Sequence, residues 1–273
     1  ALIDLFKDWD NSRTQMLDQL SSLDIVLSDI DVLVLNHMEP DHTGWLGELK
    51  KANPGIELVC TKKAAALVSS FYGITDNLRI ASSGDSLDLG RGKVLRFYEI
   101  PNVHWPETMA TWEEQSGVLF SCDAFGSFGS IGKHCFDDQL TPEEHSFYEG
   151  ESLRYYANIV STFSAFVNRA VDKLAGLDIR VIAPSHGIIW RKNPGDIVQR
   201  YVRYASYMEG PAEKEITLIW SSMYGNTEGL LESIKAGVQS EGVPLNIHRV
   251  PQEHVSWVCL LYTSDAADEE DSV

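Results

Sequence analysis

The sequence predicts an α/β fold, because short strand-like runs alternate with amphipathic helices up to about residue 210. Runs rich in β-branched and aromatic residues indicate strands at 31–37, 56–60, 94–100 and 117–123. Within residues 61–73, Ala64, Leu67, Val68 and Phe71 recur at helical spacing, which predicts a helix. Histidines and carboxylates gather where several of these strands end, a common position for functional residues.

The segment 151–177 predicts one long amphipathic helix packed on a sheet. The apolar face of this helix consists of Leu153, Tyr156, Val160, Phe163, Val167, Ala170, Val171 and Leu174. A strand at 179–184 and a helix from about 195 to 208 complete the region.

A second unit is predicted after the break at Gly210 and Pro211. A strand at 215–221, a loop at 222–227, a helix at 228–240 and a strand at 244–250 form a single βαβ pattern. We therefore divide the chain into a domain at 1–210 and the opening of a second α/β domain at 215–258. One such unit is too small to bury a complete core.

Composition limits the class of function. The chain has 273 residues, a formal charge of −18 and a pI near 4.7, which argues against nucleic-acid binding. No apolar run approaches the roughly 20 residues that span a bilayer, and no signal segment opens the chain, so we expect no membrane partner. Cys60, Cys122, Cys135 and Cys259 form no C-x-x-C pair, which argues against a rubredoxin-type site or a disulfide framework and favours a cytoplasmic protein.

Both ends of the chain are unusual. Residues 259–273 read CLLYTSDAADEEDSV and resemble a translated sequencing-library adapter. We interpret them as a disordered scar and exclude them from the fold prediction. The first residue, Ala1, leads directly into the apolar string ALIDLF, which we interpret as the start of a fragment.

The densest group of potential metal ligands lies in N-H-M-E-P-D-H-T-G: His37, Glu39, Asp41 and His42. In an extended loop, alternate side chains point the same way, so the first three are predicted to converge while His42 points across. Histidine and carboxylate ligands without nearby thiolates suit Zn, Fe or Mn rather than a structural zinc site.

Three further ligand candidates follow other predicted strands: His104, Asp123 and His186. Each has an ordinary alternative, since polar residues after strands often only stabilise turns. Their joint placement favours a metal site held by rigid strands. Asp123 could bridge two metals, because a carboxylate can offer one oxygen to each.

Four motifs together, H-x-E-x-D-H, H-W-P-E-T-M, F-S-C-D-A-F-G and A-P-S-H-G, resemble the metallo-β-lactamase-like core of the flavodiiron proteins. The resemblance extends from about residue 10 to 258 and implies an αβ/βα sandwich followed by the first βαβ unit of a flavodoxin-like domain. The family has N-terminal strands that this chain lacks, so one sheet edge is expected to be open. The implied ligands are His37, Glu39 and His104 for one iron, Asp41 and His186 for the other, and Asp123 as the bridge.

Two positions modify this implied site. His42 matches a family position that ligates the second iron in some members and not in others. Hydrolases of the same fold have histidine where this chain has Glu39, and usually bind zinc. A carboxylate in place of an imidazole makes the site harder and more anionic, which favours iron.

The loop S-M-Y-G-N-T resembles the phosphate loop of flavodoxins and implies FMN as a cofactor. Backbone N–H groups and hydroxyls at a helix N-terminus suit a phosphate monoester. The loop consists of Ser222, Met223, Tyr224, Gly225, Asn226 and Thr227.

The resemblance implies reduction of O₂ to water, of NO to N₂O, or of both, at two irons. It also implies an external electron donor (rubredoxin, a flavin reductase or reduced coenzyme F420). A head-to-tail homodimer would place the FMN of one subunit beside the diiron site of the other. Tyr155 or Tyr156 is predicted to donate a hydrogen bond to the bound gas.

Two other functions fit parts of the pattern. A zinc-dependent hydrolase of the same fold would use a metal-bound hydroxide, but Glu39 and the second domain argue against it. A non-catalytic electron carrier or gas sensor would keep the fold without turnover. Metal identity separates the hydrolase from the reductase, and gas consumption separates the sensor from the reductase.

Overall fold

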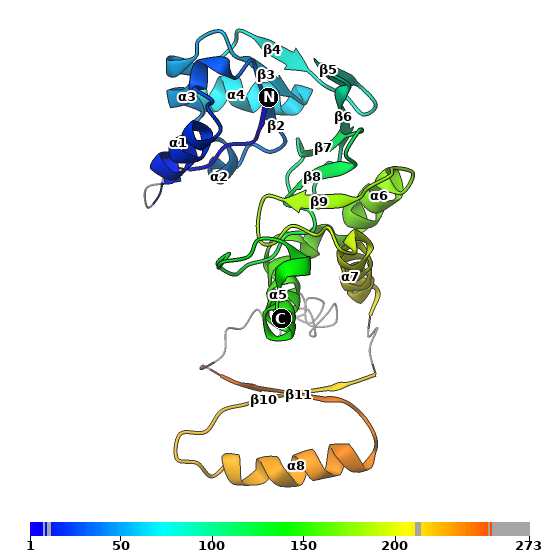
Figure 1. Ribbon diagram of the computed structural model, residues 1–273. Helices are drawn as coiled ribbons and strands as arrows, with labels where there is room; N and C mark the ends of the chain where they lie inside the picture. The colour runs from blue at the N-terminus through cyan, green and yellow to red at the C-terminus, as the bar shows by residue number, and fades with distance from the viewer. Residues whose placement is uncertain (8, 10–11, 211–213, 251, 253–273) are drawn as a thin grey trace, which may run out of the picture.

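The computed structural model describes residues 1–7, 9, 12–210, 214–250 and 252. Up to residue 210, two β-sheets are stacked and helices cover their outer faces (Figure 1). The predicted αβ/βα sandwich is therefore confirmed.

The first sheet is parallel and has the strand order β1-β2-β3-β4. Its side chains alternate between two cores: Leu33 and Leu35 pack under the helices, whereas Val32 and Val34 face the second sheet. The strands are β1 (Leu2–Ile3), β2 (Val32–Leu35), β3 (Glu57–Cys60) and β4 (Leu78–Ile80). The outer helices are α1 (Ser12–Ser22), α3 (Leu46–Ala52) and α4 (Lys62–Tyr72).

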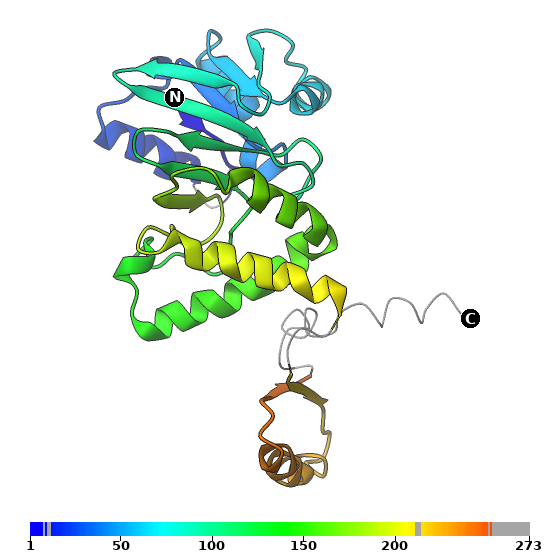
Figure 2. The ribbon, with the colours of Figure 1, turned by 90° about the vertical axis from the view of Figure 1, so that its right-hand side faces the viewer.

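The second sheet has the order β5-β6-β7-β8-β9, antiparallel except for the parallel pair β8 and β9. Leu95, Phe97 and Met109 face the first sheet, and Leu119 and Ile182 pack under the helices. The strands are β5 (Ser86–Gly90), β6 (Lys93–Glu99), β7 (Met109–Glu113), β8 (Val118–Cys122) and β9 (Val181–Pro184). The covering helices are α5 (Pro142–Tyr155), α6 (Ser164–Leu174) and α7 (Pro194–Ser206), and Figure 2 shows them along one side of this sheet.

The prediction of one long helix at 151–177 is wrong. The helix α5 begins at Pro142, where Thr141 and Glu144 form a capping box, and it ends at Tyr155. A π-helical turn (η3, Tyr156–Val160) and a 3₁₀ turn (η4, Ser161–Phe163) separate it from α6. Hydrogen bonds from the Ser161 and Ser164 hydroxyls to backbone carbonyls favour these turns over a continuous helix.

Shorter helical turns lie in the connections: α2 (Pro40–Thr43), η1 (Leu27–Asp29), η2 (Asp137–Gln139) and η5 (Tyr207–Glu209). The strands expected at 31–37, 56–60, 94–100, 117–123 and 179–184 are confirmed as β2, β3, β6, β8 and β9, and the helices at 61–73 and 195–208 as α4 and α7. Four strands and two helices were not predicted from the sequence: β1, β4, β5, β7, α1 and α3.

The last described part contains β10 (Ile216–Trp220), α8 (Glu228–Ser240) and β11 (Leu245–Arg249). The two strands pair in parallel, as predicted, and Figure 1 shows α8 beside them. The division into domains at 1–210 and 215–258 stays a prediction, and the interpretation of residues 259–273 as a scar falls outside the described residues. Among the residues that the structure describes, no helix is both long and apolar enough to cross a membrane.

Candidate metal centre

Strand ends bring the predicted ligands to one edge of the sandwich. Asp123 directly follows β8, His186 follows β9 by two residues, and His37 follows β2 by two residues. His104 lies in the connection from β6 to β7. Strands β6, β8 and β9 run in the same direction, so their carboxyl ends present side chains at the same edge.

The first group of donor atoms contains His37, Glu39, His104 and Asp123, all within 4.8 Å of one another. Glu39 Oε2 lies 3.3 Å from His37 Nε2 and 3.0 Å from His104 Nε2. Asp123 Oδ2 lies 3.4 Å from His37 Nε2 and 3.2 Å from His104 Nε2. Two imidazoles and two carboxylates therefore surround one position.

The second group contains Asp41, His42 and His186, and the other oxygen of Asp123 faces it. His186 Nε2 lies 3.2 Å from Asp41 Oδ2 and 3.3 Å from Asp123 Oδ1. His42 Nε2 lies 3.0 Å from Asp123 Oδ1 and 3.7 Å from Asp41 Oδ2. Asp123 thus turns one oxygen toward each group, which is the arrangement of a bridging carboxylate.

The expected convergence of His37, Glu39 and Asp41 in an extended loop is wrong. Pro40 begins the helical turn α2, where its fixed φ is favourable. The turn directs Asp41 and His42 into the second group while His37 and Glu39 remain in the first.

Unsatisfied polar atoms indicate that this cluster fits cations. Asp41 Oδ1, His42 Nε2 and Asp123 Oδ1 are buried and make no well-oriented hydrogen bond among the described residues, although His42 Nε2 and Asp123 Oδ1 lie 3.0 Å apart. A buried polar atom without a partner is costly, and a cation would satisfy all three at once. Imidazole and carboxylate donors suit Fe, Zn or Mn, so the residues fit a pair of such ions.

Two carboxylates that the sequence analysis missed hold the outer nitrogens of the histidines. Glu107 Oε1 lies 2.8 Å from His37 Nδ1, and Asp4 Oδ2 lies 3.3 Å from His42 Nδ1. Carboxylates in this position fix the tautomer and turn the Nε2 lone pair toward a metal. Asp4 is itself fixed, because its Oδ1 accepts the Asn36 backbone N–H at 2.7 Å.

In the metal-free chain, neighbouring carboxylates raise the pKa values of three of the histidines. Burial alone would lower the pKa of His37, but Glu107, Glu39 and Asp123 outweigh it and raise the pKa to about 9. Against the same effect of burial, Asp123 and Asp4 raise the pKa of His42 to about 11. Asp123 and Asp41 raise the pKa of His186 to about 9.

The metal-free chain is therefore expected to lose stability as the pH rises. A histidine whose pKa is raised by folding stabilises the folded state fully at a pH below its unfolded pKa of about 6.5. This stabilisation is lost as the pH rises through the folded pKa, which is about 9 for His37 and His186 and about 11 for His42. Thermal unfolding of the chelator-treated chain at pH 6.5 and pH 9 measures the effect. The metal-loaded chain is the control, since bound ions replace these protons. Equal losses of Tm with and without metal would contradict the explanation.

Of the two predicted tyrosines, the structure brings Tyr155 to the site. Its buried ring lies 5.8 Å from the His186 ring, centroid to centroid. The Tyr156 hydroxyl is instead 2.7 Å from Ser164 Oγ, and its ring packs against Tyr201. Tyr156 therefore contributes to the helical core.

The loop 222–227 lies outside the metal-binding groups, between β10 and α8. The backbone N–H of Gly225 donates to Ser222 Oγ at 2.9 Å. Met223 and Tyr224 are exposed. Thr227 is the residue before α8, and its side chain makes no capping hydrogen bond. The N–H groups of Gly229 and Leu230 donate to the carbonyls of Gly225 and Thr227, at 3.3 and 3.1 Å.

The fold and the edge site define a metallo-β-lactamase-fold protein with donors for two metal ions. A family model described as "ODP family beta lactamase" matches residues 10–187. The chain belongs to this family.

Relatives and solved structures identify the flavodiiron proteins as its neighbours. An anaerobic nitric oxide reductase flavorubredoxin from Aeromonas salmonicida is 36% identical over 246 residues, covering 88% of this chain and 46% of the relative. Rubredoxin:oxygen oxidoreductase from Desulfovibrio gigas superposes with a TM-score of 0.80 at 27% identity, covering 94% of this chain and 63% of that one. A flavo di-iron protein mutant from Thermotoga maritima gives a TM-score of 0.79 at 27% identity, with 94% and 64% covered. The resemblance expected from the motifs is confirmed, and the chain spans about half the length of the curated relatives it matches.

Proposed function

We propose that the chain contains the catalytic metal centre of a flavodiiron oxidoreductase that reduces NO to N₂O, O₂ to water, or both. The observation that carries this proposal is the pair of donor groups that share Asp123, with the carboxylate Glu39 in the first group. The names of the relatives, a nitric oxide reductase and an oxygen oxidoreductase, support the same class of reaction.

The proposed ligands follow the two donor groups. His42 is included, because its Nε2 is buried, makes no well-oriented hydrogen bond among the described residues and lies 3.0 Å from the bridging candidate, Asp123 Oδ1. Two irons in this pocket would supply electrons and open coordination positions for a small diatomic molecule. The proposed set is His37, Glu39 and His104 for one iron, Asp41, His42 and His186 for the other, and Asp123 as the bridge.

Protein groups around the pocket would orient these ligands and supply a hydrogen bond. Glu107 and Asp4 hold His37 and His42 in the required orientation. Burial raises the pKa of Tyr155 well above its usual value, so its phenol keeps a proton to donate. The pocket is most open near Glu39 and His186, whose side chains are 37% and 36% exposed, whereas the His37 and Asp123 side chains are almost fully buried.

The loop 222–227 is proposed to bind the phosphate of FMN. Its position after a parallel strand and before a helix supports this assignment, since helix N-termini favour phosphate. Electrons would come from an external donor, such as rubredoxin, a flavin reductase or reduced coenzyme F420. The domain division at 1–210 and 215–258 and the head-to-tail homodimer belong to the same proposal.

Gas consumption by the chemically reduced, iron-loaded chain tests the activity without any need for FMN. The reactions require two NO, two electrons and two protons for N₂O and water, or O₂, four electrons and four protons for two waters. We expect anaerobic additions of NO to yield N₂O, or O₂ to disappear without release of peroxide. Binding of NO without turnover would indicate a sensor, and ester hydrolysis by a zinc-loaded chain that consumes no gas would indicate a hydrolase. Either result would overturn the proposal.

A further inference from the structure

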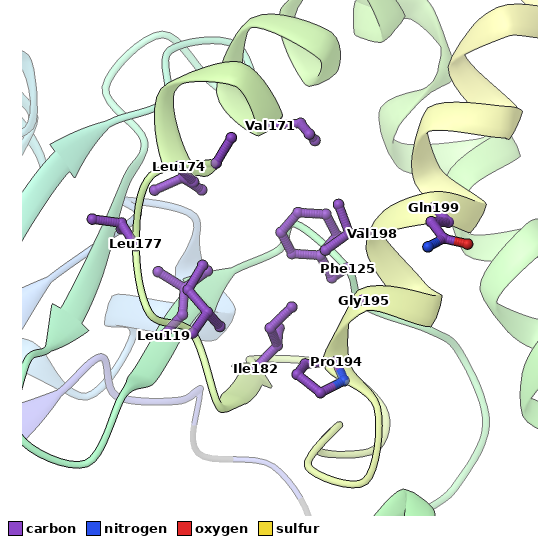
Figure 3. Close-up of a pocket in the computed structure, with 12 residues that line it drawn as sticks. Leu119, Phe125, Val171, Leu174, Leu177, Ile182, Pro194, Gly195, Val198 and Gln199 are labelled. Atoms are coloured by element: carbon purple, nitrogen blue, oxygen red, sulfur yellow. The ribbon is translucent and has the colours of Figure 1, made fainter.

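The helices that cover the two sheets contact their surroundings in different ways. On the second sheet, Leu119 of β8 and Ile182 of β9 face the helices α6 and α7 around an open, apolar pocket (Figure 3). Helix α4, on the first sheet, also buries apolar side chains, but residues at both of its ends donate hydrogen bonds to segments that carry proposed metal ligands. A hydrogen bond fixes a position more narrowly than apolar packing does, because it requires a set distance and angle.

The N-terminal end of α4 holds the segment 104–107, which contains one proposed ligand, the histidine at its start. Thr61, the N-cap residue of α4, donates its hydroxyl to the Glu107 carbonyl at 3.0 Å, and both residues are buried. The Glu107 carboxylate accepts the Met38 backbone N–H at 3.1 Å and lies 2.8 Å from His37 Nδ1. Thr61 therefore fixes the residue that orients a ligand of the first donor group.

The C-terminal end of α4 holds the turn α2, where the chain passes from the first donor group to the second. Tyr72, the last residue of α4, donates its hydroxyl to Thr43 Oγ1 at 2.9 Å. Thr43 is fully buried and donates in turn to the Glu39 carbonyl at 3.0 Å. The His42 backbone N–H donates to the same carbonyl, also at 3.0 Å. Two hydroxyls in series thus close the turn between Glu39 in the first group and His42 in the second.

A single stiff element therefore contacts the supports of both donor groups. Helix α4 has 11 residues, Lys62–Tyr72, and a length of roughly 16 Å. Its Ala64 and Val68 side chains are fully buried in the core under the first sheet, so its two ends cannot move independently of that sheet. Two metal ions that share ligands lie about 3.5–4 Å apart, so a shared carboxylate requires the two groups to be held at a fixed separation.

We propose that Thr61 and Tyr72 are positioning residues that act from the two ends of α4 and fix the separation of the two donor groups, so that Asp123 can bridge both ions. The inference rests on the proposed function, because it takes the two donor groups as the metal ligands. Loss of a residue that hydrogen-bonds directly to a ligand lowers metal affinity by about 10–100-fold. The Thr61 and Tyr72 hydroxyls act through one further residue, so their loss is expected to lower metal affinity severalfold.

Stepwise addition of cobalt(II) to the metal-free chain, followed by calorimetry, tests the C-terminal end. Cobalt(II) accepts the same imidazole and carboxylate donors as iron, and the wild type is expected to bind two ions per chain. Tyr72→Phe and Thr43→Val are expected to weaken one of the two binding steps severalfold, whereas Thr43→Ser keeps the hydroxyl and should bind like the wild type. Because the two hydroxyls act in series, Tyr72→Phe combined with Thr43→Val should bind no more weakly than Thr43→Val alone.

The N-terminal end has a matching pair of variants. Thr61→Val removes both the hydroxyl donor and the helix cap, whereas Thr61→Ser keeps both. We expect Thr61→Val to lower cobalt affinity severalfold and Thr61→Ser to retain it. Tyr98→Phe is the matched control for Tyr72→Phe, because Tyr98 is also partly buried and lies on β6, outside both contacts.

Two further measurements separate positioning from general stability. Tyr72→Phe should leave the Tm of the metal-free chain close to that of the wild type, yet change the magnetic coupling between the two cobalt ions, which depends on the geometry of the bridge. Unchanged affinity and coupling in Tyr72→Phe and Thr61→Val, or equal losses in Tyr98→Phe, would overturn the positioning role. A wild-type chain that binds fewer than two cobalt ions would instead overturn the proposed function.

Discussion

Replacing Asp123 by Asn is expected to abolish binding of the metal pair. The two carboxylate oxygens of Asp123 lie between 3.0 and 3.4 Å from the Nε2 atoms of all four proposed histidine ligands. An amide keeps the shape but loses the negative charge and turns one ligand atom into a hydrogen-bond donor. Loss of a residue that only hydrogen-bonds to a metal ligand already lowers metal affinity by about 10–100-fold. Loss of the bridging ligand itself should therefore lower metal affinity by more than about 100-fold.

Metal content after equilibration with ferrous iron measures this effect. Asp178→Asn is a suitable control, since Asp178 is exposed and pairs only with Arg180 in the described contacts. We expect the control to bind iron like the wild type. A full complement of iron in the Asp123→Asn chain would show that Asp123 is not a shared ligand.

Gly187→Ala, next to the proposed ligand His186, is expected to cause a large loss of stability. Gly187 has a φ of 81°, and a Cβ there would lie 2.0 Å from Ser127 Oγ and 3.0 Å from Ser127 N. The backbone conformation alone costs roughly 1–3 kcal/mol for a residue other than glycine. The collision adds to this cost, and it displaces the segment in which the Ser127 N–H donates to the His186 carbonyl at 3.2 Å.

Urea unfolding of the wild type, Gly187→Ala, Ser127→Gly and the double variant separates the cost of the backbone conformation from the cost of the collision. Ser127→Gly removes the two side-chain atoms that a Cβ would meet and leaves the Ser127 backbone N at 3.0 Å, so the double variant should recover most of the collision part and retain the backbone part. Gly47→Ala is the matched control, because Gly47 lies in α3 and a Cβ there meets no atom within 4 Å. Equal stabilities of the Gly187→Ala and Gly47→Ala chains would contradict the explanation.

Local patterns in the sequence were sufficient for much of the fold. The strand ends that present His37, Asp123 and His186 were predicted because apolar runs stop at polar residues. The helix at 228–240 was predicted with its observed ends. The long helix was misjudged because its apolar spacing continues across a π turn that depends on hydroxyl contacts of Ser161 and Ser164.

Less of the candidate site than of the fold could be predicted from local patterns in the sequence. The division of ligands between two groups came from the family resemblance, whereas the loop pattern alone placed Asp41 with His37 and missed the helical turn at Pro40. Glu107 was within a quoted motif, H-W-P-E-T-M, but only its histidine was considered. Asp4 had no local pattern, since its contact with His42 depends on the pairing of β1 with β2.

Metal analysis of the chain purified without oxygen tests the central claim most directly. The geometry of the two donor groups and the carboxylate Glu39 predict about two irons per chain, lost together in Asp123→Asn. About two zincs that ferrous iron cannot replace, or a single metal that survives loss of Asp123, would contradict a diiron centre bridged by this residue.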